Sequence, residues 1–393
     1  MRPLEGITVV TLEHAIAAPF ATRQLADLGA RVIKIERPGV GDFARGYDTR
    51  VRGIASHFVW TNRSKESLTL DVKHPEAQAI LSRIIEEDAD VLVQNLAPGA
   101  AARLGLSYEV LSKAKPGIIV CDISGYGDSG PYRDKKAYDL LIQSESGFVS
   151  VTGTAETPSK AGPSIADIAA GMYAYTNILA ALLHREKTGE GQHIDVSMLE
   201  SLTEWMGYPL YYSFEGAEPP KRTGASHATI YPYGPFPSGD GKTVMLGLQN
   251  EREWKAFCER VLLQPQLAAD ERYASNPKRV ANRSELYETI VQAFSTLTAA
   301  DVVQRLEDAQ IANAQVNTMG EVWNHPQLKA RGRWTEVDTS VGKVPALLPP
   351  GSWSKGAPRM DAVPSLGQHT DTILEHLGYS AEQIQALRSE GAV

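Results

Sequence analysis

Cysteine is scarce in this chain, with only Cys121 and Cys258 among 393 residues. Two cysteines cannot form a disulfide framework, and they cannot supply the thiolates of a typical structural zinc site. Basic residues are also outnumbered, 39 Lys and Arg against 47 Asp and Glu, and the net charge of -8 gives no positive field for a nucleic-acid backbone. We therefore expect no nucleic-acid partner, and a reducing, cytoplasmic setting fits the chain.

A hydrophobic run long enough to cross a bilayer is also missing. The most apolar stretch, residues 168–183, is shorter than the ~20 residues that a span needs and contains Thr176 and Asn177. The first residues enter a strand-like run without the apolar core of a signal peptide. We expect no export and no membrane partner, and we interpret residues 168–186 as a buried helix.

Several motifs of common enzyme classes are absent. The turn after the first expected strand, residues 13–20, has no G-x-G-x-x-G, so the usual dinucleotide fingerprint is missing. The chain has no G-x-x-x-x-G-K-[ST] loop, no H-E-x-x-H helix and no G-x-S-x-G elbow. None of the 9 histidines pairs with another His or with Cys at metal-ligand spacing, so no metal site is expected.

Short β-branched runs alternate with helical patterns in the first part of the chain. They predict strands at residues 7–12, 31–35, 67–70, 91–93 and 118–123 and helices at 20–28 and 75–87. Strands separated by helices indicate a mostly parallel sheet covered on both faces. The expected fold class is α/β, with an open, Rossmann-like sheet.

Polar residues follow the expected strands where an open sheet binds its ligands, beyond the carboxyl ends. These ends carry Glu13-His14, Glu36-Arg37, Gln94-Asn95 and Ser124-Gly125-Tyr126-Gly127. Any solvent-facing loop could show the same polarity, so each position alone is ambiguous. Because polar residues follow four of the expected strands, the pattern favours a ligand site at the carboxyl ends of the sheet.

The later part of the chain changes pattern. Residues 231–248 are typical of a hairpin, and residues 251–262, 284–297 and 299–309 carry apolar side chains at helical spacing. Thr298 with Asp301, and Ser380 with Gln383, have the spacing of helix N-terminal caps. The pattern predicts a smaller α+β domain, followed by short strands and two terminal helices.

Asp167 stands immediately before the long apolar helix, with small residues around it. One interpretation is a plain N-cap, because Asp is among the best N-capping residues. The other is a covalent nucleophile, because the positive end of a helix stabilises an ionised carboxylate and small neighbours leave room for a bulky substrate. The residues alone leave both open.

Eight short segments are distributed over essentially the whole chain, at residues 3–10, 29–39, 62–73, 94–99, 125–131, 166–173, 187–192 and 366–371. In their order and spacing they resemble the class III CoA transferases, the CaiB/BaiF family. The resemblance implies that Asp167 attacks an acyl-CoA thioester, forming first an aspartyl anhydride and then an aspartyl-CoA thioester. It also implies CoA esters as substrates and no tightly bound cofactor.

By position, further residues are similar to the CoA-binding set of the family. They are Arg37, Lys73, Asn95, Leu96, Arg103, Lys136, Tyr138 and Asp139. Each of the cations among them, considered alone, is also consistent with a solvated surface charge. The resemblance also implies a large CoA-binding domain at 1–190 and 335–393, linkers at 191–225 and 326–334, a small domain at 226–325, and an interlocked-ring homodimer.

The substrate is expected to be a small carboxylic acid. The segment from Arg222 to Phe236 resembles those of members that handle C4 and C5 dicarboxylates, namely itaconate, mesaconate, citramalate or malate, with succinyl-CoA as the donor. It lacks the glycine-run loop of formyl-CoA transferases, which disfavours oxalate. The residues considered for the free carboxylate are His14, Arg45, Arg52, His227 and Tyr231.

Two alternatives to that reaction remain. An α-methylacyl-CoA racemase-like epimerase would need a histidine where this chain has Tyr138, so it would lose one of its two bases. An intramolecular mesaconyl-CoA transferase would move CoA within one substrate. A non-enzymatic or nicotinamide-binding α/β protein is the remaining reading from residues alone, and the missing glycine fingerprint weakens its nicotinamide form.

Overall fold

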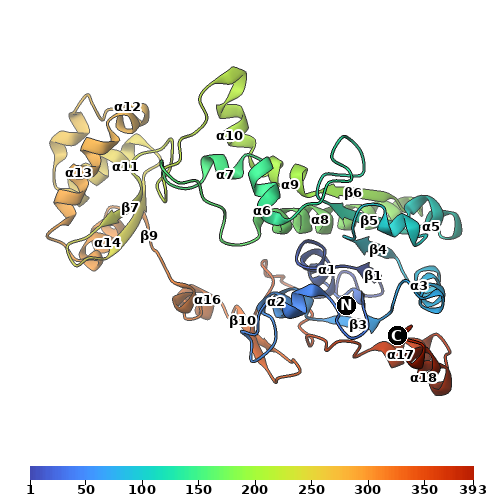
Figure 1. Ribbon diagram of the computed structural model, residues 1–393. Coiled ribbons are helices and arrows are strands. Elements are labelled where there is room, and N and C mark those ends of the chain that lie inside the picture. The colour runs from blue at the N-terminus through green and yellow to red at the C-terminus, as the bar shows by residue number, and fades with distance from the viewer. The chain divides into compact units, whose positions relative to one another are not determined.

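The computed structural model describes residues 1–393 and separates the chain into two compact units (Figure 1). Unit 1 comprises residues 1–147, 161–206 and 327–393, and unit 2 comprises residues 148–160 and 207–326. Residues 191–225, expected as a linker, are thus divided between the two units. Residues 148–160, expected within the large domain, belong to unit 2.

Unit 1 is built around a six-stranded sheet in the order β3-β2-β1-β4-β5-β6, in which every neighbouring pair is parallel. Its strands are β1 (Thr8–Leu12), β2 (Arg31–Glu36), β3 (Lys65–Thr69), β4 (Val91–Gln94), β5 (Ile119–Ser124) and β6 (His193–Ser197). The order reverses direction beside β1, as in a doubly wound sheet. The predicted parallel α/β sheet is confirmed.

Helices cover both faces of this sheet. Unit 1 contains α1 (Ala17–Asp27), α2 (Ser56–Asn62), α3 (Pro75–Glu87), α4 (Ala100–Arg103), α5 (Tyr108–Ala114), α6 (Asp139–Glu145), α8 (Ile165–Thr188), α9 (Met198–Trp205), α17 (Thr370–His376) and α18 (Ala381–Ser389). Strand residues such as Val10, Ile33 and Leu92 form one core with α3, α17 and α18. Their sequence neighbours point to the other face, since side chains alternate along a strand, and α1 and α8 lie there.

Helix α8 begins earlier than expected. Ser164 occupies its N-cap position, so Asp167 is the third helical residue and not the N-cap. The small residues Ala166, Ala170 and Ala174 are buried, whereas Leu183 is 60% exposed. The expectation of a wholly buried helix is therefore corrected to a helix buried along one face.

The length and apolar composition of α8 would also let it span a membrane, a test that core helices of soluble proteins pass as well. Within unit 1 it packs against α1, α9, β5 and β6. The contact with α1 is close: a Cβ added to Gly171 would lie 2.7 Å from the Ala17 carbonyl oxygen. Glycine at this position lets the two helix backbones approach.

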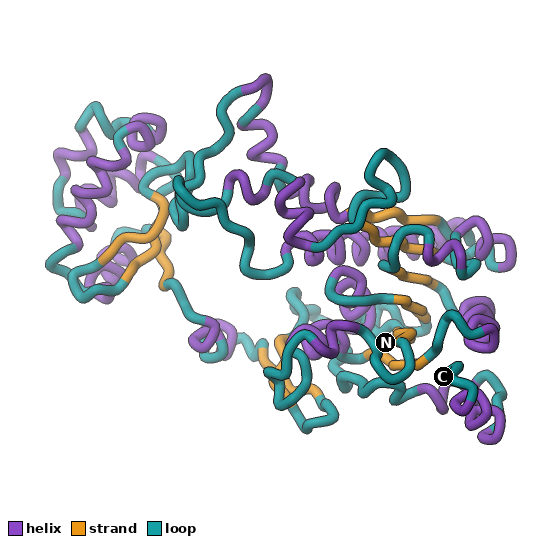
Figure 2. The backbone as a smooth tube through the Cα atoms, in the orientation of Figure 1, coloured by secondary structure: helices purple, strands orange, loops and turns teal.

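Unit 2 contains a three-stranded antiparallel sheet, β7-β8-β9, and several short helices (Figure 2). Its elements are α7 (Phe148–Val151), α10 (Gly207–Tyr212), β7 (Tyr233–Pro237), β8 (Thr243–Gly247), α11 (Glu251–Ala256), α12 (Asn276–Ala281), α13 (Arg283–Phe294), α14 (Ala299–Asp308), β9 (Ala312–Gln315) and α15 (Met319–Val322). The predicted hairpin and the Thr298–Asp301 capping box are confirmed. Strand β9 was not expected.

The last part of the chain returns to unit 1. It contains α16 (Pro326–Ala330), which spans the boundary between the units, and the hairpin of β10 (Trp334–Val337) with β11 (Val344–Leu347). Beyond the hairpin, the chain reaches the outer edge of β3, where the Ser67 N–H donates to His369 Nδ1 and the Thr69 N–H to Thr370 Oγ1. The C-terminal segment thus covers the free edge of the sheet.

Candidate active site

Asp167 lies in the first turn of α8 with its side chain partly buried. Burial, together with the nearby negative charge of Asp139, raises the pKa of the Asp167 carboxyl to about 7. A carboxyl group with this pKa is about half ionised near neutral pH. A perturbed acid at the edge of an open sheet is a candidate for chemistry.

Asp139 explains why the helix end does not lower that pKa. Its Oδ1 accepts the N–H of Ala166 at 2.8 Å and the N–H of Asp167 at 3.4 Å. Its Oδ2 accepts from Gln143 Nε2 at 2.6 Å. Asp139 therefore takes helix donors that would otherwise favour an ionised Asp167, and it adds a like charge. The expectation that the helix end stabilises the ionised Asp167 is corrected.

The substitution Asp139→Asn should lower the pKa of Asp167. An asparagine keeps a side-chain oxygen for the Ala166 N–H but removes the negative charge that disfavours ionisation. The titration of the Asp167 carboxyl, followed by carbon NMR from about pH 4 to 9, should shift to lower pH in the variant. An unchanged or higher midpoint would show that Asp139 is not a cause of the raised pKa.

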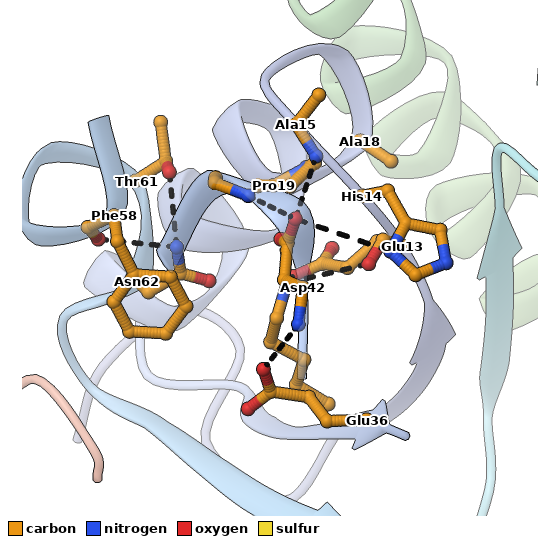
Figure 3. Close-up of polar contacts among 12 residues, drawn as sticks. Glu13, His14, Ala15, Ala18, Pro19, Glu36, Asp42, Phe58, Thr61 and Asn62 are labelled. Atoms are coloured by element: carbon orange, nitrogen blue, oxygen red, sulfur yellow. Dashed lines mark hydrogen bonds and ion pairs between the residues drawn. The ribbon is translucent and has the colours of Figure 1, made fainter. Parts of the chain in front are cut away.

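A tight turn follows β1 and leads into α1, which packs against α8. Ala15 has a φ of 62° there, in the left-handed region that non-glycine residues rarely adopt. The Asn95 side chain holds the residue before it, since its Oδ1 accepts the His14 N–H and its Nδ2 donates to the His14 carbonyl, both at 2.9 Å. Asp42 Oδ1 accepts the Ala15 N–H at 3.0 Å (Figure 3).

Buried charges lie beneath this turn. The carboxylate of Glu13 accepts from Lys34 Nζ at 3.1 Å and from Lys65 Nζ at 2.6 Å, and Lys34 also pairs with Asp42 at 2.8 Å. These side chains are essentially removed from solvent. We call Glu13, Lys34, Asp42 and Lys65 the buried charge cluster. Sequence reasoning noted Glu13 only as a polar strand end and did not single out the two lysines, which lie within strands.

The cluster shows strongly perturbed pKa values. Burial raises the pKa of Glu13, but the ammonium groups of Lys34 and Lys65 outweigh it and lower this pKa to about 2. Burial lowers the pKa of Lys65 to about 8. For Lys34, burial is outweighed by Glu13 and Asp42, and its pKa is raised. Glu13, Lys34 and Lys65 are therefore ionised near neutral pH.

Two observations place the turn near Asp167. The turn leads into α1, whose Ala17 carbonyl contacts α8 at Gly171, one helical turn beyond Asp167. Burial raises the pKa of Tyr47, and the charges of Asp42 and Asp167 raise it further, so the Tyr47 side chain lies within electrostatic range of both. The carboxyl end of β1 and the start of α8 therefore face one region of unit 1.

The expected phosphate-binding cations lie along one edge of the sheet. Arg37 follows β2, Lys73 lies between β3 and α3, Arg103 ends α4 after β4, and Lys136 precedes α6 after β5. All four side chains are exposed. No ion pair engages any of them within unit 1, so they are available to an anionic ligand.

The remaining members of the expected CoA set differ in their surroundings. The Asn95 amide is engaged with the His14 backbone, as described above. Leu96 packs against the core, and its N–H donates to Gln94 Oε1 at 2.7 Å. Tyr138 is 74% exposed at the N-cap of α6, directly before Asp139. Tyr138 is thus the member of these three whose side chain is open to a ligand.

The substrate candidates of unit 1 also differ. Arg45 is bound by both carboxylate oxygens of Glu36, at 2.8 and 2.6 Å, and its guanidinium lies 3.8 Å from the centre of the Phe58 ring. Arg52 is exposed and reaches only the Lys343 carbonyl, at 3.5 Å. Burial, the largest effect, lowers the pKa of His14, which leaves its ring neutral near neutral pH. His14 can therefore offer a hydrogen bond but not a positive charge.

His227 and Tyr231 belong to unit 2. The Nδ1 of His227 accepts the N–H groups of Thr229 and Ile230, both at 3.1 Å, and its ring stacks on Tyr233. Tyr231 is 3% exposed and packs within the core of unit 2. The Nδ1 of His227 is therefore occupied by its own loop, whereas the Tyr231 hydroxyl is buried without a hydrogen-bond partner.

The known proteins that this chain resembles identify the family. The sequence model of the family described as CoA-transferase family III matches residues 4–370. The chain belongs to CoA-transferase family III. It is therefore an enzyme that transfers CoA, and the resemblance noted in its sequence is confirmed.

Named relatives within the family differ in their acids. A mouse succinyl-CoA:glutarate CoA-transferase is 35% identical over 100% of this chain and 91% of its own length. The beta subunit of a succinyl-CoA–L-malate CoA-transferase from Chloroflexus aurantiacus is 32% identical over 100% of this chain and 98% of its own length. An acetyl-CoA:oxalate CoA-transferase from Acetobacter aceti is 36% identical over 84% of each chain.

A solved structure of the family shares the fold of this CoA transferase. A CAIB/BAIF family protein from Brucella suis aligns with a TM-score of 0.83 and 33% identity, covering 96% of this chain and 99% of that chain. The six-stranded parallel sheet is consistent with that fold.

Proposed function

We propose that this enzyme transfers CoA from succinyl-CoA to a C4 or C5 dicarboxylic acid, with Asp167 as the covalent nucleophile. The observation that carries the proposal is the carboxyl of Asp167, partly buried at a helix start with its pKa raised to about 7. A more basic carboxylate is a better nucleophile, and it still ionises at neutral pH.

Each step exchanges one bond for another. An Asp167 carboxylate oxygen attacks the thioester carbonyl, the C–O bond forms, and the C–S bond breaks to release CoA thiolate and leave a mixed anhydride. The thiolate then attacks the aspartyl carbonyl, which releases succinate and leaves an aspartyl-CoA thioester. The acceptor carboxylate displaces the thiolate to form a second anhydride, and attack of the thiolate on the acceptor's acyl carbonyl regenerates Asp167.

The chain's other residues would bind CoA and exclude water. Arg37, Lys73, Arg103 and Lys136 are exposed, unpaired cations that follow successive strands of the sheet, which suits a ligand with several phosphates. Leu96 would offer an apolar contact, and Tyr138 stands beside Asp139 at the start of α6. Water must be kept from the anhydride, because hydrolysis would discard the activated acyl group.

The choice of donor and acid follows the relatives. Two of them are named for succinyl-CoA, with glutarate or malate as the acid. We therefore keep malate, itaconate, mesaconate and citramalate as acceptors and add glutarate. Because one relative is named for oxalate, oxalate stays in the test, although the segment from Arg222 to Phe236 lacks the glycine-run loop.

The alternative reactions have less support. An α-methylacyl-CoA racemase-like reaction would need a histidine as its second base where this chain has Tyr138, so one of its two bases would be missing. An intramolecular mesaconyl-CoA transferase would use the same Asp167 chemistry, so only product analysis separates it from the intermolecular reaction. Both alternatives would use residues that also have a role in the principal proposal.

We propose that two chains form an interlocked-ring homodimer. Large apolar side chains are exposed on and around α9 and α10, including Trp205 at 46%, Tyr211 at 82% and Phe214 at 64%. Leu183 on α8 is also exposed. Exposed apolar groups of this size are typical of surfaces that a partner covers.

The proposal is tested by the products that the enzyme forms. Incubation with succinyl-CoA and a panel of glutarate, malate, itaconate, mesaconate, citramalate and oxalate should yield a new CoA ester of a C4 or C5 acid, detected by mass spectrometry. Deuterium uptake at the α-carbon without any acceptor would favour the racemase. Transfer to oxalate alone, or no new ester from any acid of the panel, would contradict the proposed substrate class.

A further inference from the structure

The buried carboxylate of Asp42 joins two loops at the ligand edge of the sheet, and the mechanism proposed above gives it no role. Its Oδ1 accepts the N–H groups of Ala15 at 3.0 Å and Ala44 at 2.9 Å. Its Oδ2 accepts from Lys34 Nζ at 2.8 Å. Asp42 is 1% exposed, so both oxygens are fixed by these contacts and not by water.

The turn that Asp42 holds is conformationally unfavourable. Ala15 is a non-glycine residue with a φ of 62°, a conformation that persists only where the surroundings impose it. The Asp42 carboxylate accepts the Ala15 N–H (Figure 3), and the Asn95 amide bonds both the N–H and the carbonyl oxygen of His14. Strained backbone conformations of this kind cluster at active sites.

This turn determines the positions of the His14 ring and of the start of α1. The His14 ring stacks on Phe43, which directly follows Asp42, with ring centres 4.4 Å apart. The chain then enters α1, whose Ala17 carbonyl contacts Gly171 of α8. A shift of the turn would therefore move groups beside the start of α8, where Asp167 lies.

The buried charge cluster holds the Asp42 carboxylate in place. Lys34 shares its ammonium between Asp42 and Glu13, and Lys65 neutralises Glu13 from the other side. Glu36 Oε1 accepts the Asp42 N–H at 3.0 Å, which fixes the backbone as well as the side chain.

We propose that Asp42 is a positioning residue for acyl transfer, which fixes the strained His14–Ala15 turn so that a bound thioester is aligned with Asp167. The inference rests on the proposed role of Asp167. Asp42 does not touch the reacting atoms; it acts through the Ala15 amide. Its loss should impair alignment in the reacting complex more than binding of the CoA ester, because small displacements of reacting groups lower turnover strongly.

The test compares the full-length variants Asp42→Ala and Asp42→Asn with the wild type, using succinyl-CoA and the best acceptor from the product screen. Asp42→Ala should lower kcat by about 10²-fold, and KM for succinyl-CoA should stay within about threefold. Asp42→Asn keeps an oxygen for the Ala15 N–H, so its kcat should stay within about fivefold of the wild type. A wild-type kcat for Asp42→Ala, or no rescue by asparagine, overturns the proposal.

The matched control is Asp27→Asn. Asp27 is also buried and pairs with two cations, Arg23 at 2.8 Å and Arg63 at 2.7 Å, but it lies at the far end of α1. This control should lower stability without lowering kcat of the folded fraction. An equal fall of kcat in Asp27→Asn would mean that any buried ion pair has the same effect, and the positioning role would be wrong.

A further variant covers the case in which Asp42→Ala does not fold. Asp42→Glu keeps the charge beside Lys34 but carries its oxygens one methylene further, so it should lower kcat while Asp42→Asn does not. The opposite order would overturn the proposal. Asp167→Ala is assayed in parallel: its normal turnover would refute the proposed nucleophile, whereas an inactive Asp167→Ala beside a normal Asp42→Ala would refute only the positioning role.

Discussion

Replacing Asp167 with alanine should abolish CoA transfer, lowering turnover by about 10⁴-fold or more. In the proposed mechanism both covalent intermediates form on this carboxyl, so no other side chain could take over. The rate of CoA ester formation measured by mass spectrometry, with CoA affinity measured by calorimetry, should show lost turnover with binding retained. Hydroxylamine added during turnover should convert the Asp167 carboxyl of the wild type into a hydroxamate.

The loss of activity should not come from unfolding. The pKa of Asp167 is raised from 3.8 to about 7, so the folded state favours the neutral acid. That preference stabilises the fold below about pH 4 and is lost as the pH rises through about 7, a difference of up to ~4 kcal/mol. Asp167→Asn should therefore be at least as stable as the wild type at about pH 8. Persistent turnover of either variant would refute the nucleophile.

Replacing Glu13 with glutamine should destabilise the protein by roughly 3 to 5 kcal/mol near neutral pH, because Lys34 and Lys65 lose the carboxylate that they share. The free energy of unfolding, measured in urea, gives the size of the loss. Glu87→Gln is the control, since the Arg83–Glu87 pair is exposed on α3 and its loss should hardly matter.

The decrease of the free energy of unfolding at acid pH gives a second test of the role of Glu13. Its pKa is lowered from 4.5 to about 2 in the folded protein, where Lys34 and Lys65 outweigh the opposing effect of burial. The contribution of the carboxylate, roughly 3 kcal/mol, is complete above about pH 4.5 and is lost as the pH falls through about 2. In Glu13→Gln the free energy of unfolding should therefore depend less on pH in this acid range. The prediction would be contradicted by an equally strong pH dependence in the variant, or by a free energy of unfolding within about 1 kcal/mol of the wild type at pH 7.

The two central strands of the unit 1 sheet, β1 and β4, were predictable because they are largely apolar. Runs such as Thr8–Leu12 and Val91–Gln94 have few competing interpretations once helices separate them. Strand β9 was not predicted, since Ala312–Gln315 is polar and has no β-branched residue. Its strand conformation depends on pairing with β8, which lies about 70 residues earlier and leaves no local pattern.

The chemistry of the candidate site could be predicted only in part. Asp167 stood out in the sequence, but Ser164 is an equally good cap three residues earlier, and the helix begins there. The raised pKa depends on Asp139, 28 residues away, whose bonds to the helix amides no local pattern reveals. Lys34 and Lys65 were hidden for the same reason, since their carboxylate partners come from other segments.

The edge of β3 has a consequence for synthesis of the chain. The N–H groups of Ser67 and Thr69 form their hydrogen bonds to the side chains of His369 and Thr370, which lie some 300 residues further along the chain. A growing polypeptide on the ribosome therefore carries an open strand edge until its final residues emerge, and such edges invite pairing with other chains. Proteolytic clipping before Gly367 would return the finished enzyme to that aggregation-prone condition.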